Sequence, residues 1–299
     1  MTAEGVPQRP DPFGRERLAE NFRALGLRHG QHLLVHSSLR RVGRVDGGAA
    51  TVLDSIRDAA GQQATLVVPT QTSWNSLSSA AFMAATAGLD AQERARYIAA
   101  IPGFDPASTP SSGMGAFAEY VRTSPGAVRS RHPQTSFAAL GPSAQECMSV
   151  HDLDCHLGDR SPLGWLYEAD AAILLLGVGY SVCTAFHLAE YRLGGPRRPH
   201  HCFTGGAQGR DERVFLAIEL DDSDFESLGA DLDATEQSPV PAVRHGQVGF
   251  ATCRLVQLRA AVDFGARWLK DHRGPITADG SFETRHHQTY LSSQLVRYD

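Results

Sequence analysis

A histidine and a glutamate three residues apart could carry acid–base chemistry in this chain. His187 and Glu190 stand in the stretch TAFHLAEYR, and residues at this spacing share one face of a helix. An imidazole titrates near neutral pH and can take a proton from an amine, while a neighbouring carboxylate can orient the ring. Taken alone, this spacing more often means a buried histidine beside a surface carboxylate, so the surrounding sequence must decide.

The residues before this pair predict elements that would place it at a cleft. Residues 173–176 form a short apolar run, which is typical of a strand buried on both faces of a sheet. The sequence GVG follows and permits a sharp turn, after which Ser181 or Thr184 could cap a helix. The sequence thus predicts a strand, a glycine turn and a helix whose first turns present the histidine and the glutamate.

A second set of segments would suit a ligand that carries phosphate groups. A strand predicted at His32–His36 runs directly into two serines, and free backbone N–H groups usually gather at such a turn. Further along, Gly-Met-Gly lets the backbone approach a ligand, and an arginine such as Arg129 can form planar forks to phosphate oxygens. For the stretch RSRHP alone, a solvated basic turn is the better explanation. The glycines match neither GxGxxG nor GxxxxGK and do not by themselves indicate a nucleotide site.

Two polar regions are candidates for substrate recognition. Residues 70–110 form a long irregular connection after a strand predicted to end at Pro69. Residues 219–224 are acidic and follow a strand predicted at Val214–Ile218, so their carboxylates could bind ammonium groups. A variable surface insertion explains residues 70–110 equally well, and a solvated acidic turn explains residues 219–224 equally well. The stretch PRRPHH, residues 196–201, is expected to form a basic loop.

Composition excludes several classes of partner. The chain has 299 residues, 42% of them hydrophobic, and a formal net charge of −5 without a basic run, so no nucleic-acid partner is expected. No apolar segment is long enough to span a bilayer and the N-terminus does not read as a signal peptide, so we expect a cytoplasmic protein without a membrane partner. The five cysteines form no CxxC pair and are expected to be reduced. His200, His201 and Cys202 are adjacent, but without a second cluster they do not indicate a metal site.

The order of the predicted elements indicates an α/β fold. A helix expected at residues 50–60 lies between apolar strands at His32–His36 and Ala64–Pro69, an order typical of parallel sheets with crossover helices. The chain is long enough for one large domain or two intimate lobes. Residues 1–12 are expected to be a flexible N-terminal arm, residues 13–275 the folded domain, and residues 276–299 a polar C-terminal tail.

Taken together, these segments resemble the aminoglycoside 3-N-acetyltransferase family, whose fold is unrelated to that of the GNAT acetyltransferases. The resemblance covers nearly everything from Arg15 to Asp271, and order and spacing agree throughout. Its carriers are LLVHSSLRRVG (33–43), TLVVPT (65–70), FDP (104–106), TPSSGMGAFAE (109–119), RSRHPQTSFAALG (129–141), SPLGWLYE (161–168), LLLGVG (174–179) and TAFHLAEYR (184–192).

The resemblance implies a two-lobed α/β fold, with a central, mostly parallel sheet flanked by helices, that binds acetyl-CoA and a small-molecule amine. It implies that His187 is the general base, with Glu190 beside it. The coenzyme is expected at Ser37, Ser38, Ser112, Gly113, Met114, Gly115, Arg129, Ser130, Ser136 and Phe137. The amine is expected at Thr70, Trp74, Glu219, Asp221 and Asp222. The resulting hypothesis is direct acetyl transfer from acetyl-CoA to an aminoglycoside amine, without a metal; a homodimer is left open.

Departures from the family's pattern bear on the substrate. Ser181 and Cys183 stand where the family usually has Asp and Asn, and the loop QTSWNSLSSAAF after Thr70 lacks the acidic residues often found there. An amine intermediate of natural-product biosynthesis is therefore an alternative acceptor. Two further classes stay open: a hydrolase that uses Ser37 or Cys183 with His187, and a non-catalytic protein that binds coenzyme A.

Overall fold

A computed structural model of the chain describes residues 11–206, 209–235 and 241–274. The predicted N-terminal arm, apart from residues 11 and 12, and the predicted C-terminal tail lie outside these ranges. No helix in the described ranges combines the length and the apolar character that a membrane span needs.

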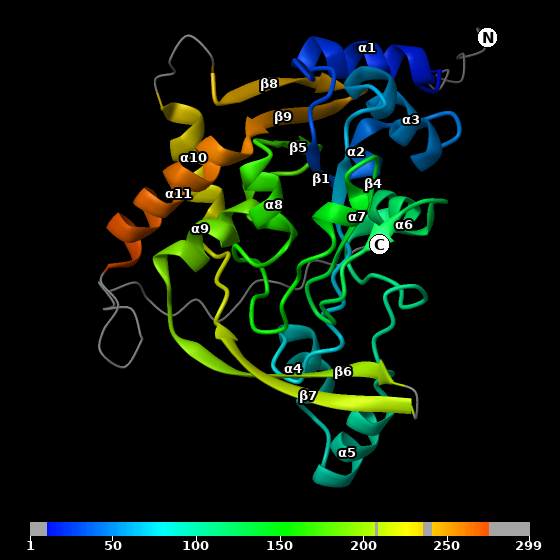
Figure 1. The fold of residues 1–299 in the computed structure, drawn as a ribbon. Coiled ribbons are helices and arrows are strands. Elements are labelled where there is room, and N and C mark those ends of the chain that lie inside the picture. The colour runs from blue at the N-terminus through cyan, green and yellow to red at the C-terminus, as the bar shows by residue number, and fades with distance from the viewer. Residues whose placement is uncertain (1–10, 207–208, 236–240, 275–299) are drawn as a thin grey trace, which may run out of the picture.

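A seven-stranded sheet in the order β3-β4-β2-β1-β5-β9-β8 forms the centre of the fold (Figure 1). The three central strands, β2 (Leu66–Pro69), β1 (Leu33–Ser37) and β5 (Ala172–Leu176), pair in parallel. The flanking strands pair antiparallel and are β4 (Phe137–Leu140), β3 (Val128–Arg129), β9 (Ala251–Gln257) and β8 (Val243–Val248). Because β3 and β8 each reverse direction a second time, five of the seven strands run the same way. This confirms the predicted α/β class with a mostly parallel sheet, although parallel pairing is confined to its centre.

Helices cover both faces of this sheet, so its central strands are buried on both sides. Along β1, Leu33 and Val35 pack into one core cluster and Leu34 into the other, as the alternation of side chains in a strand requires. One face carries α1 (Arg15–Leu25), α2 (Leu39–Val42), α3 (Ala49–Ala60) and α6 (Gly115–Thr123). The other carries α7 (Ala144–Cys147), α8 (Pro162–Glu168), α9 (Ala185–Leu193), α10 (Phe225–Ala234) and α11 (Leu258–Arg273).

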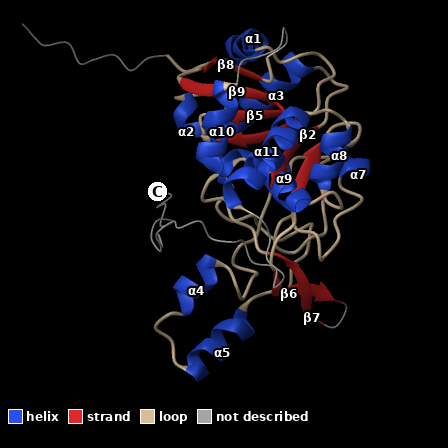
Figure 2. Ribbon diagram, turned by 90° about the vertical axis from the view of Figure 1, so that its left-hand side faces the viewer, coloured by secondary structure: helices blue, strands red, loops and turns tan. Residues whose placement is uncertain are grey.

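The remaining elements gather at one end of the molecule, away from the sheet (Figure 2). They are α4 (Ala80–Thr86), α5 (Ala91–Ala100) and the two-stranded sheet of β6 (Arg197–Gly206) and β7 (Gly209–Ile218). The expectation of a loop at residues 196–201 was wrong, because most of that stretch belongs to β6 and pairs antiparallel with β7. Both strands of a two-stranded sheet are edge strands, and an edge strand tolerates a proline such as Pro199.

Candidate active site

The structure brings the histidine and the glutamate of α9 into direct contact. His187 Nδ1 lies 2.7 Å from Glu190 Oε2, and the two residues are only 9% and 2% exposed. Because an ionised carboxylate can only accept a hydrogen bond, Nδ1 carries the proton and Nε2 has the free lone pair. No residue in the described ranges hydrogen-bonds to Nε2. The pair therefore has the arrangement of an oriented base.

The turn between β5 and α9 sets the position of this pair. Gly177 has φ 69°, and a Cβ at this position would lie 2.7 Å from the side chain of Arg41, so only glycine fits. Neither Ser181 nor Thr184 caps α9 with its side chain, contrary to expectation. The Thr184 hydroxyl instead lies 3.3 Å from Nε2 of His36, which joins the start of α9 to strand β1.

An arginine that the sequence did not single out completes the site. Arg273, the last residue of α11, donates from Nη1 to Glu190 Oε1 over 2.5 Å. Its Nη2 and Nε atoms donate to the two carboxylate oxygens of Asp224, at 2.7 and 2.8 Å. Only the folded position of α11 reveals that its last side chain reaches α9.

The acidic segment before α10 also meets the pair. The backbone N–H of Asp221 donates to Glu190 Oε1 over 2.9 Å. Burial raises the pKa of the Asp222 carboxyl, although the nearby His187 opposes the rise. Burial also disfavours the charged form of Asp221, but hydrogen bonds from Ser223 and the Arg273 charge outweigh it and lower its pKa. Glu219 is engaged elsewhere, 2.6 Å from Arg198.

Two segments that were expected to bind the coenzyme lie next to each other where β1 ends and α6 begins. A Cβ at Gly115 would lie 3.7 Å from the Ser37 carbonyl oxygen, and Gly113 and Gly115 both have positive φ angles of 70° and 82°. Ser112 lies in the same loop, with its Oγ 3.1 Å from that of Ser73. The first backbone N–H groups of a helix lack intrahelical partners and attract anions. The start of α6 beside Ser37 therefore suits a phosphate-bearing ligand.

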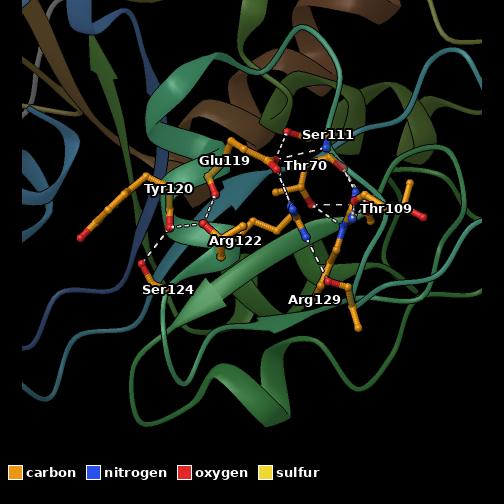
Figure 3. Close-up of polar contacts among 11 residues, drawn as sticks. Thr70, Thr109, Ser111, Glu119, Tyr120, Arg122, Ser124 and Arg129 are labelled. Atoms are coloured by element: carbon orange, nitrogen blue, oxygen red, sulfur yellow. Dashed lines mark hydrogen bonds and ion pairs between the residues drawn. The ribbon is translucent and has the colours of Figure 1, made fainter.

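Arg129, expected at the coenzyme, is held by oxygens of the protein itself. Its Nε lies 3.0 Å from Ser136 Oγ and 3.2 Å from Thr70 Oγ1, its Nη2 donates to the Thr70 carbonyl over 2.5 Å, and Nη1 donates to the Thr109 carbonyl (Figure 3). Burial lowers the pKa of its guanidinium to about 10. All three of its nitrogens thus tie loops together, and the second N–H of each terminal nitrogen has no partner among the described residues.

The loop that enters α6 is held by a second charged group in the same view. Glu119 accepts hydrogen bonds from the hydroxyl of Ser111 at 2.7 Å and from Nη2 of Arg122 at 2.6 Å (Figure 3). The hydrogen bond from Arg122 is the main reason that the pKa of Glu119 falls to about 2. This carboxylate anchors the residue before Ser112 and so fixes the loop that leads to Gly115.

Three other expected site residues make contacts within the protein. Ser130 Oγ accepts from the backbone N–H of Phe137 at 2.9 Å, and Phe137 lies in the core. Trp74 packs beside Phe82, Ile101 and Phe203 in the smaller cluster. A cavity of about 1060 Å³ lies beside β3, and Arg129 is the one member of the expected coenzyme set among its described lining residues, which include Phe104, Asp105, Arg131 and His151.

Comparisons with known proteins identify the family to which the chain belongs. The sequence model of the aminoglycoside 3-N-acetyltransferase family matches residues 34–270. The chain belongs to this family. It is an acyltransferase on that basis.

Individual members of the family resemble this chain in both sequence and structure. The SPbeta prophage-derived aminoglycoside N(3')-acetyltransferase-like protein YokD of Bacillus subtilis is 33% identical over 86% of the chain and 93% of that protein. Its crystal structure gives a TM-score of 0.80 over 88% of this chain and 95% of that one. Aminoglycoside N(3)-acetyltransferase VII of Streptomyces paromomycinus is 32% identical over 88% and 93%. A structure described as AAC-IIIb binary with CoASH is 27% identical, with a TM-score of 0.75 over 87% and 97%.

The structure also contains a cluster of four histidines, three of them buried, that the sequence did not predict. Neighbouring rings in the series His151, His132, His156 and His200 lie 4.6 to 4.7 Å apart. His132 and His151 use both ring nitrogens in hydrogen bonds, whereas the buried Nε2 atoms of His156 and His200 have no partner among the described residues. No group of three or more His, Cys, Asp or Glu side chains in the described ranges is placed to hold a metal ion.

We expect these histidines to make the fold sensitive to acid. Burial lowers the pKa of His36 and of His151 to about 4. It also lowers the pKa of His132 and of His156. The unfolded chain takes up these protons once the pH falls below about 6.5, while the folded chain resists until about 4, so stability is full above this window and is lost within it. His36 and His151 each account for about 3 kcal/mol of this loss.

Urea unfolding at several pH values measures the acid sensitivity. The free energy of unfolding should fall steadily between about pH 6.5 and pH 4. Replacing His151 with glutamine should make the fall shallower, because one buried titrating group is gone. A free energy of unfolding that stays constant or rises across this window would contradict the expectation.

Proposed function

We propose that this chain transfers an acetyl group from acetyl-CoA to an amine of an aminoglycoside, with His187 as the general base. The observation that carries the proposal is the 2.7 Å contact of His187 Nδ1 with a buried Glu190, which leaves Nε2 as the basic atom. The names of the relatives, and the CoASH in the AAC-IIIb structure, support the choice of substrate and co-substrate.

The proposed reaction begins with the loss of a proton from the acceptor. An amine is mostly protonated at neutral pH and cannot attack a thioester until it loses that proton. His187 Nε2 takes it, and the carboxylate of Glu190 stabilises the imidazolium that forms. The amine nitrogen then bonds to the acetyl carbon, gives up its second proton, and the carbon–sulfur bond breaks. Of the two protons lost from nitrogen, one passes through His187 to the leaving thiolate and the other goes to solvent.

The chain's own residues fit acetyl-CoA at the start of α6. Gly113 has open space where a side chain would stand, and its neighbour Gly115 adjoins the Ser37 carbonyl. The coenzyme supplies the activated acetyl group, and its phosphates would lie against the N-terminus of α6 and the hydroxyls of Ser37 and Ser38. The thioester lies a whole pantetheine arm away from these phosphates, so other backbone N–H groups would have to stabilise charge on its carbonyl oxygen. Arg129 would act by holding the loops rather than by binding phosphate.

A natural-product amine is a second candidate acceptor, because a specific observation favours it. Two carboxylates of the acidic segment are already paired, Glu219 with Arg198 and Asp224 with Arg273. Asp222 is half-buried near His187 and forms no ion pair with any residue that the structure describes. Asp221 likewise forms no ion pair among the described residues, so two carboxylates are available, which suits an acceptor with fewer positive charges than a typical aminoglycoside.

Thiol release in the presence of candidate amines tests the proposed function. The protein is mixed with acetyl-CoA and either aminoglycosides or amino-bearing metabolites, and the products are identified by mass spectrometry. An amine-dependent release of CoA with one acetyl group added to the amine is the expected result. Release without an amine would indicate a hydrolase, and binding without release would indicate a non-catalytic CoA-binding protein.

Replacing Cys183 with alanine should leave most of the activity intact. The thiol is buried, and burial raises its pKa to about 12, so the nucleophilic thiolate is scarce at neutral pH. A mechanism through a cysteine nucleophile predicts instead that this variant is inactive. Steady-state acetyl transfer by the variant and the unmodified protein separates the two mechanisms, and intact-protein mass spectrometry would reveal an acetylated thiol.

A further inference from the structure

We propose that Arg273 positions the carboxylate of Glu190 against His187 and thereby sets the pH range in which the base works. The inference rests on the proposed function, in which His187 takes the proton of the acceptor amine. Arg273 lies beyond residue 270, where the match to the family ends. It therefore lies outside the segments that identified the family. The role that we assign to it is to position Glu190.

The guanidinium of Arg273 joins three parts of the chain at one point. Its side chain is 7% exposed, and it donates to Glu190 on α9, to both carboxylate oxygens of Asp224, and to the carbonyl of Asp221 over 2.5 Å. A planar fork with several fixed donors can satisfy such separate acceptors at once, whereas the single ammonium of lysine cannot. The identity of this residue therefore matters beyond its charge.

Arg273 fixes Glu190 because both carboxylate oxygens are then engaged. Oε2 accepts from the ring of His187, while Oε1 accepts from Arg273 and from the backbone N–H of Asp221. A carboxylate that is 2% exposed is costly without a compensating charge. Without Arg273, the carboxylate would lose its nearest cation and hold the ring less rigidly, which lowers kcat, while its negative charge stays beside the imidazole.

The charge of Arg273 also affects which form of the imidazole is favoured. Among the described residues, the titratable and charged groups that contact the pair or interact with the base are Glu190 on α9, Asp221 and Asp222 before α10, Arg273 on α11, and His156. Three of these are carboxylates, which favour a protonated imidazole, and Arg273 is the cation that balances them. A protonated imidazole cannot accept the substrate's proton, so loss of Arg273 should extend the inactive range to higher pH.

The pH dependence of acetyl transfer in four variants tests this inference. In Arg273→Gln, we expect the acidic limb of kcat/KM to move up by about one pH unit, and kcat to fall about tenfold, with KM for acetyl-CoA unchanged. Arg273→Lys keeps the charge, so its acidic limb should stay near that of the unmodified protein while kcat falls. Asp224→Asn removes one of the two carboxylates paired with Arg273, so its acidic limb should move to lower pH. Arg267→Gln removes an exposed arginine of the same helix and serves as the matched control.

The opposite directions expected for two of these variants separate positioning from general damage. Should Arg273→Gln fold poorly, Asp224→Asn and Arg273→Lys still give the test. Lower activity with an unmoved acidic limb in both Arg273→Gln and Asp224→Asn would overturn the inference and leave the proposed function standing. The proposed function itself fails if the unmodified protein transfers no acetyl group, or if replacing His187 leaves the rate unchanged.

Discussion

Replacing His187 with glutamine is expected to lower kcat for acetyl transfer by about two to four orders of magnitude. The imidazole is the one group on α9 whose free ring nitrogen can take a proton near neutral pH, and an amide cannot do so. The ring lies beside Phe225, with centroids 4.7 Å apart, and glutamine fills part of that volume. The variant should therefore fold and lose the chemical step.

Coenzyme binding distinguishes a lost base from a damaged site. Because the expected coenzyme residues lie at Ser37 and the start of α6, titration calorimetry should give CoA the same affinity in the variant within about twofold. His245→Gln is a suitable control, since His245 is half-exposed and its ion pair with Asp233 lies apart from α9. Near-normal turnover in the His187 variant would show that another group removes the proton.

Replacing Glu190 with glutamine is expected to be almost as damaging, by about three orders of magnitude in kcat. Arg273 and the N–H of Asp221 both donate to the Oε1 position, so the amide oxygen must occupy it. The amide nitrogen then faces His187 and donates to Nδ1, which moves the ring proton to Nε2. The base is thereby held in the tautomer that cannot accept a proton.

The same substitution should also destabilise the fold by about 3 kcal/mol, because it removes the buried charge that faces Arg273. Urea unfolding measures this loss, and assays well below the unfolding midpoint keep it apart from the kinetic effect. Glu212→Gln is the matched control, since Glu212 is exposed and its carboxylate pairs with the half-exposed ring of His201. Unchanged kcat in the Glu190 variant would mean that ring orientation does not limit the reaction.

The parts of the site that could be predicted are those set by local sequence patterns. The apolar run of β5, the glycines after it and the spacing of His187 and Glu190 all depend on neighbours in sequence, and a helix fixes which residues share a face. The same holds for the buried strands β1 and β2 and for α3 between them. These elements could be read from residue type and periodicity.

The parts that could not be predicted depend on contacts between distant segments. Arg273 meets Glu190 across 83 residues, and no local pattern reports where the end of α11 lies in space. Arg129 has the chemistry of a phosphate ligand, but the fold turns it toward the carbonyls of Thr70 and Thr109. Residues 197–201 have the composition of a loop, and pairing with β7 makes them part of a strand.

A crystal structure of the protein with CoA and an acceptor amine would test the central claim most directly. The account predicts that Nε2 of His187 lies about 2.6 to 3.2 Å from the amine nitrogen, directly or through one water, with the sulfur of CoA on the far side of that nitrogen. Glu190 should still hold Nδ1, as it does without ligands. An amine bound out of reach of the ring, or a sulfur atom remote from it, would contradict the account.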